Sequence, residues 1–244
     1  MNPSSRAISL LFFTNVATLG ALGFLVLTGF AQARTSFEEL TVQRINVVSP
    51  AGKTVLAISN QERIAPPVMG GKSYPVSVSE GRELMAGMIF FNQAGDEMGG
   101  LVFNSFQRPD GKYAGIGHLS FDRFHDNQVL ALQYKENAST VQAGLTLYDR
   151  PANGKFKTSL DLIEEARSAK PERAAEIQAE LAEMSAHHEL GVERVFLGSK
   201  DQNAQLLLRD SQGRVRARLV VDAGDTARLE FLDDAGKVTA RFPD

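Results

Sequence analysis

The sequence predicts a mainly β protein, built as a repeated β-hairpin meander with an inserted helical hairpin and an N-terminal transmembrane helix. Apolar and polar residues alternate with a period of two in many short runs, which is typical of strands. Turn sequences that end in glycine separate these runs, and a long uncharged segment opens the chain. Closure of the strands into a barrel, a solenoid or propeller-like blades stays open.

The segment 1–33 is predicted to be a membrane anchor or a signal peptide. Residues 7–33 carry no charge, and a membrane-spanning helix needs about 20 apolar residues. Arg6 precedes this segment and Glu38 and Glu39 follow it, so we expect a single pass through the inner membrane with residues 34–244 extracytoplasmic. The alternative is a periplasmic or secreted protein cleaved after Ala33, because 31–33 reads Ala-Gln-Ala.

The C-terminal run 206–242 contains the clearest strand pattern. Residues 229–232 and 238–242 alternate on either side of Asp233-Asp234-Ala235-Gly236, which fits a type I turn followed by a bulge. Related turns occur at 49–52, 92–95, 108–111 and 210–213. Five similar runs begin at Ile45, Met88, Leu145, Leu206 and Leu229, which indicates a repeat. Calcium binding by the turn aspartates is the alternative interpretation.

Between the repeats, residues 61–85 break the strand pattern with several prolines and glycines. A long irregular segment in a compact domain is often functional, so Arg63, Lys72 and Tyr74 are candidate binding contacts, with solvated loop residues as the alternative. Residues 86–104 predict a second hairpin. Its residues Met88, Phe90, Leu101 and Phe103 are expected in the core.

His118, Asp122, His125 and Asp126 form the densest group of chemically competent residues. Two histidines and two carboxylates can make a metal site or an acid–base pair. The alternative is a turn at 126–127 with no chemistry.

The segment 157–191 predicts a helical hairpin. Thr158 or Ser159 fits a helix cap, and Pro171 fits the first turn of a second helix that Gly191 ends. Ala174, Ile177, Leu181 and Met184 make an apolar stripe on that second helix. We expect this stripe to pack within the chain, with docking of another protein as the alternative.

Residues 44–60, 86–104, 117–132 and 143–151 resemble a group of bacterial membrane-anchored or exported β-repeat proteins with no assigned activity. The resemblance covers about half of the chain and implies a bacterial envelope protein. It transfers no functional residue.

These observations favour a non-enzymatic envelope protein that binds or scaffolds a partner through 61–85 or the helical insertion. The chain has no cysteine, no His-Glu-x-x-His, no Gly-x-Ser-x-Gly and no phosphate-binding loop, so we assign no cofactor, metal ligand or catalytic residue. A net charge of −3 argues against nucleic acid. The alternative function is an envelope hydrolase or glycan-active enzyme that uses the group at 118–126.

Overall fold

The computed structural model describes residues 3–29 and 36–243. Two compact units meet in sequence between Thr41 and Val42. In the first unit, α1 (Pro3–Gly29) is long and apolar enough over Ala7–Phe24 to cross a membrane, and a signal sequence has the same character. The predicted cleavage sequence at 31–33 lies outside the described residues.

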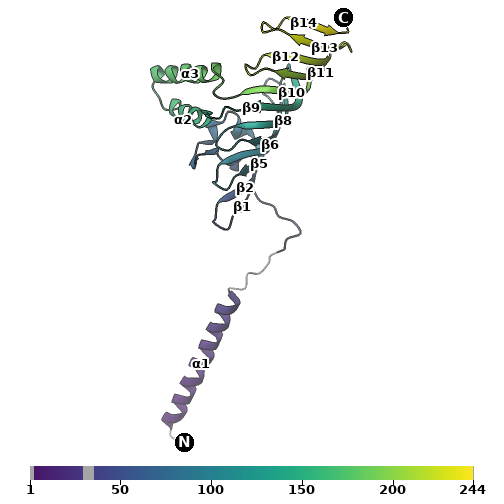
Figure 1. Cartoon of the computed structure of the whole chain (residues 1–244). Coiled ribbons are helices and arrows are strands. Elements are labelled where there is room, and N and C mark those ends of the chain that lie inside the picture. The colour runs from purple at the N-terminus through teal and green to yellow at the C-terminus, as the bar shows by residue number, and fades with distance from the viewer. Residues whose placement is uncertain (1–2, 30–35, 244) are drawn as a thin grey trace. The chain divides into compact units, whose positions relative to one another are not determined.

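The second unit is built on one antiparallel sheet of twelve strands (Figure 1). The sheet order follows the chain order, each inner strand pairs with the strand on either side of it, and β1 and β14 are the open edges. The predicted meander is therefore confirmed, and the described strands form no closed barrel. The strands are β1 (Arg44–Val48), β2 (Thr54–Ser59), β5 (Ala86–Phe91), β6 (Glu97–Gln107), β7 (Tyr113–Asp122), β8 (Gln128–Glu136), β9 (Val141–Asp149), β10 (Val192–Lys200), β11 (Asn203–Arg209), β12 (Val215–Val221), β13 (Ala227–Leu232) and β14 (Val238–Phe242).

The hairpin turns have the predicted geometry. In the last one, the Gly236 amide donates to the Asp233 carbonyl at 3.1 Å, and Gly236 has φ +78°. The strand register shifts beside this turn, between Phe231 and Leu232, as a bulge requires. The turns that end at Gly52, Gly95, Gly111 and Gly213 repeat the hydrogen bond and the positive φ.

Gly236→Ala is expected to destabilise the β unit by about 1 kcal/mol, or roughly 2–4 °C in melting temperature. An added Cβ meets no atom within 4 Å, so the cost is that of the left-handed backbone alone. Gly224→Ala is the matched control, because Gly224 lies in the neighbouring turn without a positive φ. Thermal melting followed by circular dichroism compares the two, and equal melting temperatures would contradict the turn assignment.

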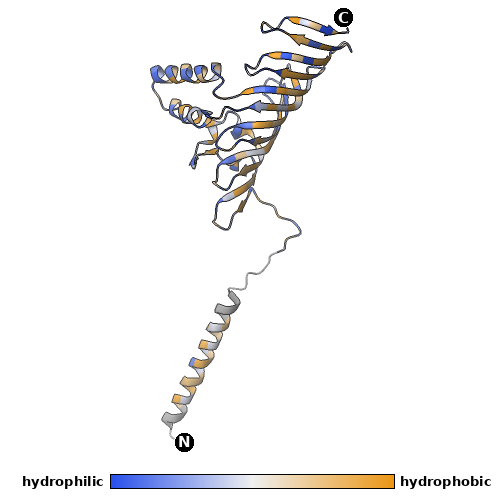
Figure 2. Ribbon diagram, in the orientation of Figure 1, coloured by the Kyte–Doolittle hydropathy of each residue, from blue (hydrophilic) through white to orange (hydrophobic). Residues whose placement is uncertain are grey.

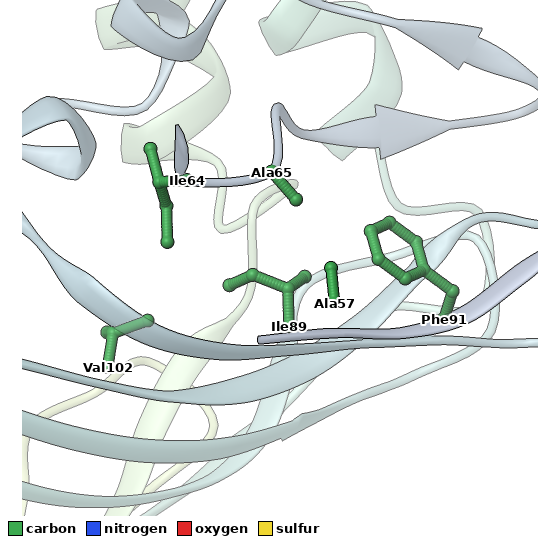
Figure 3. Packing of buried hydrophobic residues seen from close by; sticks show 6 residues of the cluster. All are labelled: Ala57, Ile64, Ala65, Ile89, Phe91 and Val102. Atoms are coloured by element: carbon green, nitrogen blue, oxygen red, sulfur yellow. The ribbon is translucent and has the colours of Figure 1, made fainter. Parts of the chain in front are cut away.

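Residues 61–85 cover part of one face of the sheet, over β2, β5 and β6. This segment contains η1 (Gln61–Arg63), the two-residue strands β3 (Val68–Met69) and β4 (Lys72–Ser73), η2 (Val76–Val78) and η3 (Arg82–Leu84). Figure 3 shows Ile64 and Ala65 of the segment pointing toward the sheet residues Ile89 and Phe91, and together they form a buried core. The irregular segment is thus part of the folded core.

The helical insertion forms α2 (Phe156–Ala166) and α3 (Pro171–Ala186), which lie together on one side of the sheet (Figure 1). Leu160 of α2 packs against the 61–85 segment, and Ile177 and Met184 of α3 pack with Leu162 of α2. The expected packing of this stripe within the chain is confirmed.

The predicted helix ends need correction. Neither Thr158 nor Ser159 caps α2, because the helix begins at Phe156 and the Ser159 hydroxyl donates to the Phe156 carbonyl at 2.7 Å. The helix α3 ends at Ala186, before Gly191, whose φ of +88° instead allows entry into β10.

In β5 and β6, the side chains that are buried are not the ones that the sequence predicted. Ile89, Phe91 and Val102 are buried beneath the covering segment, whereas Phe103 is 56% exposed. Successive strand residues point to opposite faces, so Met88, Phe90 and Leu101 share the uncovered face with Phe103. The expectation that these four form the core is wrong, because the run 88–91 is apolar on both faces. We call the uncovered side the apolar face and the other the covered face.

Candidate functional site

A cleft lined by both polar and apolar side chains lies on the covered face, between the sheet, the 61–85 segment and α2. It consists of two hollows of about 210 and 230 Å³ that share Ser79, Arg82, Glu97 and Gln128. Arg82 is buried and lies 2.9 Å from the Glu97 carboxylate, and its Nε donates to the Ala65 carbonyl at 2.7 Å. This ion pair therefore ties the covering segment to β6.

Asp122 lines the hollow of this cleft that α2 borders. Burial, followed by the negative charge of Glu97, raises the pKa of Asp122 to about 7. Its Oδ1 is buried without a hydrogen-bond partner in the described part of the chain. The result is a carboxyl group that stays protonated in mildly acidic solution.

The four residues of the 118–126 group do not meet in one site. His118 lies 2.6 Å from the Gln133 amide, and burial lowers its pKa. His118 and Asp122 are four residues apart on β7 and so roughly 13 Å apart on the same face. Within the described ranges, no group of three or more histidines and carboxylates could hold a metal.

His125 instead contributes to the structure of a turn. Its imidazole lies 3.0 Å from the carboxylate of Asp96, which is fully buried and also accepts the Gly71 amide at 2.8 Å. Asp126 is buried in the same turn, where its amide donates to the Arg123 carbonyl. Through Asp96, these contacts join the β7–β8 turn to the covering segment. His125 and Asp126 therefore have structural roles.

The candidate binding residues of the 61–85 segment make contacts with other parts of the same chain. Tyr74 is only 1% exposed and donates to Asp161 of α2 at 2.9 Å, so the solvated-loop interpretation is wrong for this residue. Lys72 lies 2.7 Å from Asp161 and 2.6 Å from Glu164. Hydrogen bonds from Lys157, then Lys72, hold the pKa of Asp161 well below its usual range. Arg63 contributes a backbone carbonyl, which accepts from Arg44.

The aspartates of the C-terminal turns are engaged by their own backbone. Asp222 Oδ1 accepts the amides of Gly224 and Thr226 at 2.9 and 3.0 Å. The Thr226 amide and the Arg228 guanidinium lower the pKa of Asp222. Asp233 accepts two turn amides in the same way. These carboxylates serve as turn caps, which argues against the calcium interpretation.

The apolar face contains rows of apolar residues that lie far apart in the sequence. In each row, every residue pairs with the next across neighbouring strands. The first row has one residue on each strand from β1 to β14 of the sheet, and all of its residues are apolar. Apolar positions recur along all the strands in Figure 2. The first row contains Ile45, Ile58, Met88, Leu101, Leu119, Leu132, Leu145, Leu197, Leu206, Leu219, Leu229 and Phe242.

A second row runs beside the first and is also apolar throughout. It contains Val47, Leu56, Phe90, Gly99, Phe121, Leu130, Leu147, Val195, Leu208, Ala217, Phe231 and Ala240. At Gly99, where the row lacks a side chain, the rings of Phe90 and Phe121 stack with centroids 6.1 Å apart. The strand pairs thus extend one apolar surface across the whole sheet.

A third row, on β5 to β13, widens the apolar face. It contains Ala86, Phe103, Gly117, Tyr134, Ala143, Ser199, Ala204, Val221 and Ala227. Over Gly117, an open hollow of about 370 Å³ has Phe103 and Tyr134 among its walls. None of the residues in the three rows is charged.

The apolar face is open to solvent in the isolated chain. Leu132 is 51% exposed and Leu197 is 54% exposed, although both belong to the central strands of the sheet. On the covered face, by contrast, their neighbours Ala131 and Phe196 are buried. Water therefore contacts the side of the sheet that is richer in leucine.

No protein-family model matches the chain, and no curated protein matches it. The argument for function therefore rests on the geometry of the sheet.

Proposed function

We propose that this protein is a non-enzymatic protein of the bacterial envelope, held at a membrane by α1, that binds or scaffolds a partner through the apolar face. The observation that carries the proposal is the pair of apolar rows that run without a break across all twelve strands of the sheet, with exposed leucines such as Leu132 and Leu197 at its centre.

The size of the apolar face is the reason to expect a partner. Twelve strands with a spacing of about 4.8 Å give a length of roughly 50 Å, and three rows give a width of roughly 15–20 Å. An apolar area on the order of 900 Å² exceeds the few hundred Å² that monomeric soluble proteins usually expose as one patch. Leaving this area in water would promote aggregation, so its occupation by a partner fits the fold.

The position of the partner follows from the predicted topology of the chain. A retained α1 places the β unit on the extracytoplasmic side of the inner membrane, where a membrane-bound partner would be available. Cleavage after Ala33 would instead release a periplasmic or secreted domain. The apolar face needs a partner in either case.

The second candidate is a hydrolase or glycan-active enzyme, and Asp122 is the observation in its favour. A carboxylic acid with a pKa of about 7, beside the Glu97 carboxylate in a cleft, resembles a general acid with its companion. Glu97 is already ion-paired with Arg82, however. His118 is hydrogen-bonded to Gln133, and His125 lies beside Asp96, so neither histidine joins Asp122. Loss of biological activity in a folded Asp122→Asn variant would favour the enzyme.

Single cysteines test the proposal cleanly because the chain has none of its own. In membranes from cells that express the full chain, Leu197→Cys is expected to react with a maleimide roughly tenfold more slowly than Lys200→Cys. Lys200 is the control because it is also exposed and lies on the same strand, but its side chain is on the opposite side of the sheet from Leu197 and Ser199. Equal labelling rates would mean that the apolar face is bare in the membrane, and the proposal would fall.

A further inference from the structure

The apolar face matches the size of an interface between two protein sheets. Covering its area of roughly 900 Å² on each of two molecules would bury about 1,800 Å², within the usual range for a stable protein–protein interface. Sheets pack face to face about 10 Å apart when their inner faces are apolar. The apolar face therefore has the size and composition of one half of such a β-sandwich.

The distribution of charge argues against a lipid surface as the occupant. Proteins that lie on bacterial membranes combine apolar residues with basic residues that contact anionic headgroups. Here the basic side chains of β12–β14 lie on the opposite side of the sheet, where Arg218 and Arg241 contact Glu230 at 2.5 and 2.7 Å. The three rows of the apolar face offer no cation to a headgroup.

A second copy of the chain fits the apolar face better than a charged partner does. In a two-fold symmetric dimer the same patch occupies both sides of the interface, so a charge near the two-fold axis would approach the identical charge of the other copy. The rows contain none, and the rim is polar, with Arg194 paired to Asp149 at one side and Tyr134 bonded to Glu136 at the other. An apolar centre with a polar rim is the usual pattern of a dimer interface.

We infer that the partner on the apolar face is a second copy of this chain, packed face to face so that two open sheets form a two-layer β-sandwich. The inference rests on the proposed function and names its partner. The β8 strand is sixth of twelve in the sheet, so a two-fold axis through the middle of the face places Leu132 near the Leu132 of the partner copy.

Cross-linking of single-cysteine variants of the full chain in native membranes tests this inference. Under mild oxidation by dissolved oxygen, which reaches cysteines that are shielded from maleimides, Leu132→Cys is expected to form a disulfide-linked species of twice the 26.5 kDa chain mass, with at least about tenfold the yield of the control Lys200→Cys. Leu145→Cys, on the adjacent strand of the same row, provides a second variant with the same expectation. The melting temperature of each variant shows that it folds.

The same variants distinguish the two ways in which the inference can fail. If Leu132→Cys is protected from a monofunctional maleimide but gives no dimer, another molecule covers the apolar face: the second copy is overturned and the proposed function stands. If Leu132→Cys reacts freely and gives no dimer, both are overturned.

Discussion

Ala131→Asp is expected to unfold the β unit, whereas Leu132→Asp, one residue further along β8, is expected to be tolerated. Ala131 is 0% exposed and lies between Ser120 and Thr146 on the covered face. A carboxylate there would be buried without a partner, at a cost of roughly 4 kcal/mol or more, which is a large part of the stability of a typical domain. Leu132 is 51% exposed in the single chain, so in a monomer dispersed by detergent an aspartate there stays hydrated and costs about 1 kcal/mol in lost cross-strand packing.

Circular dichroism and thermal melting of the two full-length variants in the same mild detergent measure this difference. The pair is its own control, because the two residues are adjacent and receive the same side chain. A Leu132→Asp variant that unfolds while Ala131→Asp melts normally would reverse the assignment of the two faces.

Asp122→Asn is expected to stabilise the protein at pH 8 by about 2–4 kcal/mol, a rise of roughly 4–12 °C in melting temperature. Burial and the neighbouring charge of Glu97 hold the pKa of Asp122 near 7, and Asp126 acts in the same direction while Arg150 and Arg82 oppose it. Asparagine preserves the shape of the side chain and removes the buried charge.

The sign of the pH dependence follows from the raised pKa of Asp122. The unfolded chain releases this proton near pH 4, whereas the folded chain keeps it until about pH 7. The wild-type protein therefore loses stability from Asp122 as the pH rises from about 4 to 7. Melting curves of both proteins from pH 4 to 8 should converge at the acidic end. A constant difference across this range would show that Asp122 has an ordinary pKa.

The sequence was sufficient for the class of fold because its signals are local. The Asp-x-x-Gly turns place a glycine where the backbone needs a positive φ, and the structure repeats this geometry at Gly213 and Gly236. Pro171 likewise marks the beginning of α3. Whether the sheet closes depends on contacts between distant strands, so the open edges at β1 and β14 could not be read from any one segment.

The faces of the sheet could be predicted only in part. In strands such as 88–91 both sides are apolar, so periodicity alone does not say that Ile89 is buried and Met88 is not. The five repeated runs did indicate which residues share the apolar face, because their first residues, from Ile45 to Leu229, all lie in the first apolar row. Only the strand register joins them into one surface.

The candidate site was the least predictable part. His118 and His125 are close in sequence, but β7 holds the first on the covered face, whereas a turn pairs the second with Asp96. The role of Tyr74 depends on Asp161, 87 residues away in the chain. Proximity in sequence was a poor guide here because strand geometry separates near neighbours and tertiary packing joins distant residues.

The labelling rate of Leu197→Cys in intact membranes tests the central claim most directly, because the isolated chain leaves that side chain 54% exposed. A rate roughly tenfold below that of the opposite-face control Lys200→Cys would show that a partner covers the apolar face. Equal rates at the two positions would contradict the account, and the cleft around Asp122 would become the first place to look for function.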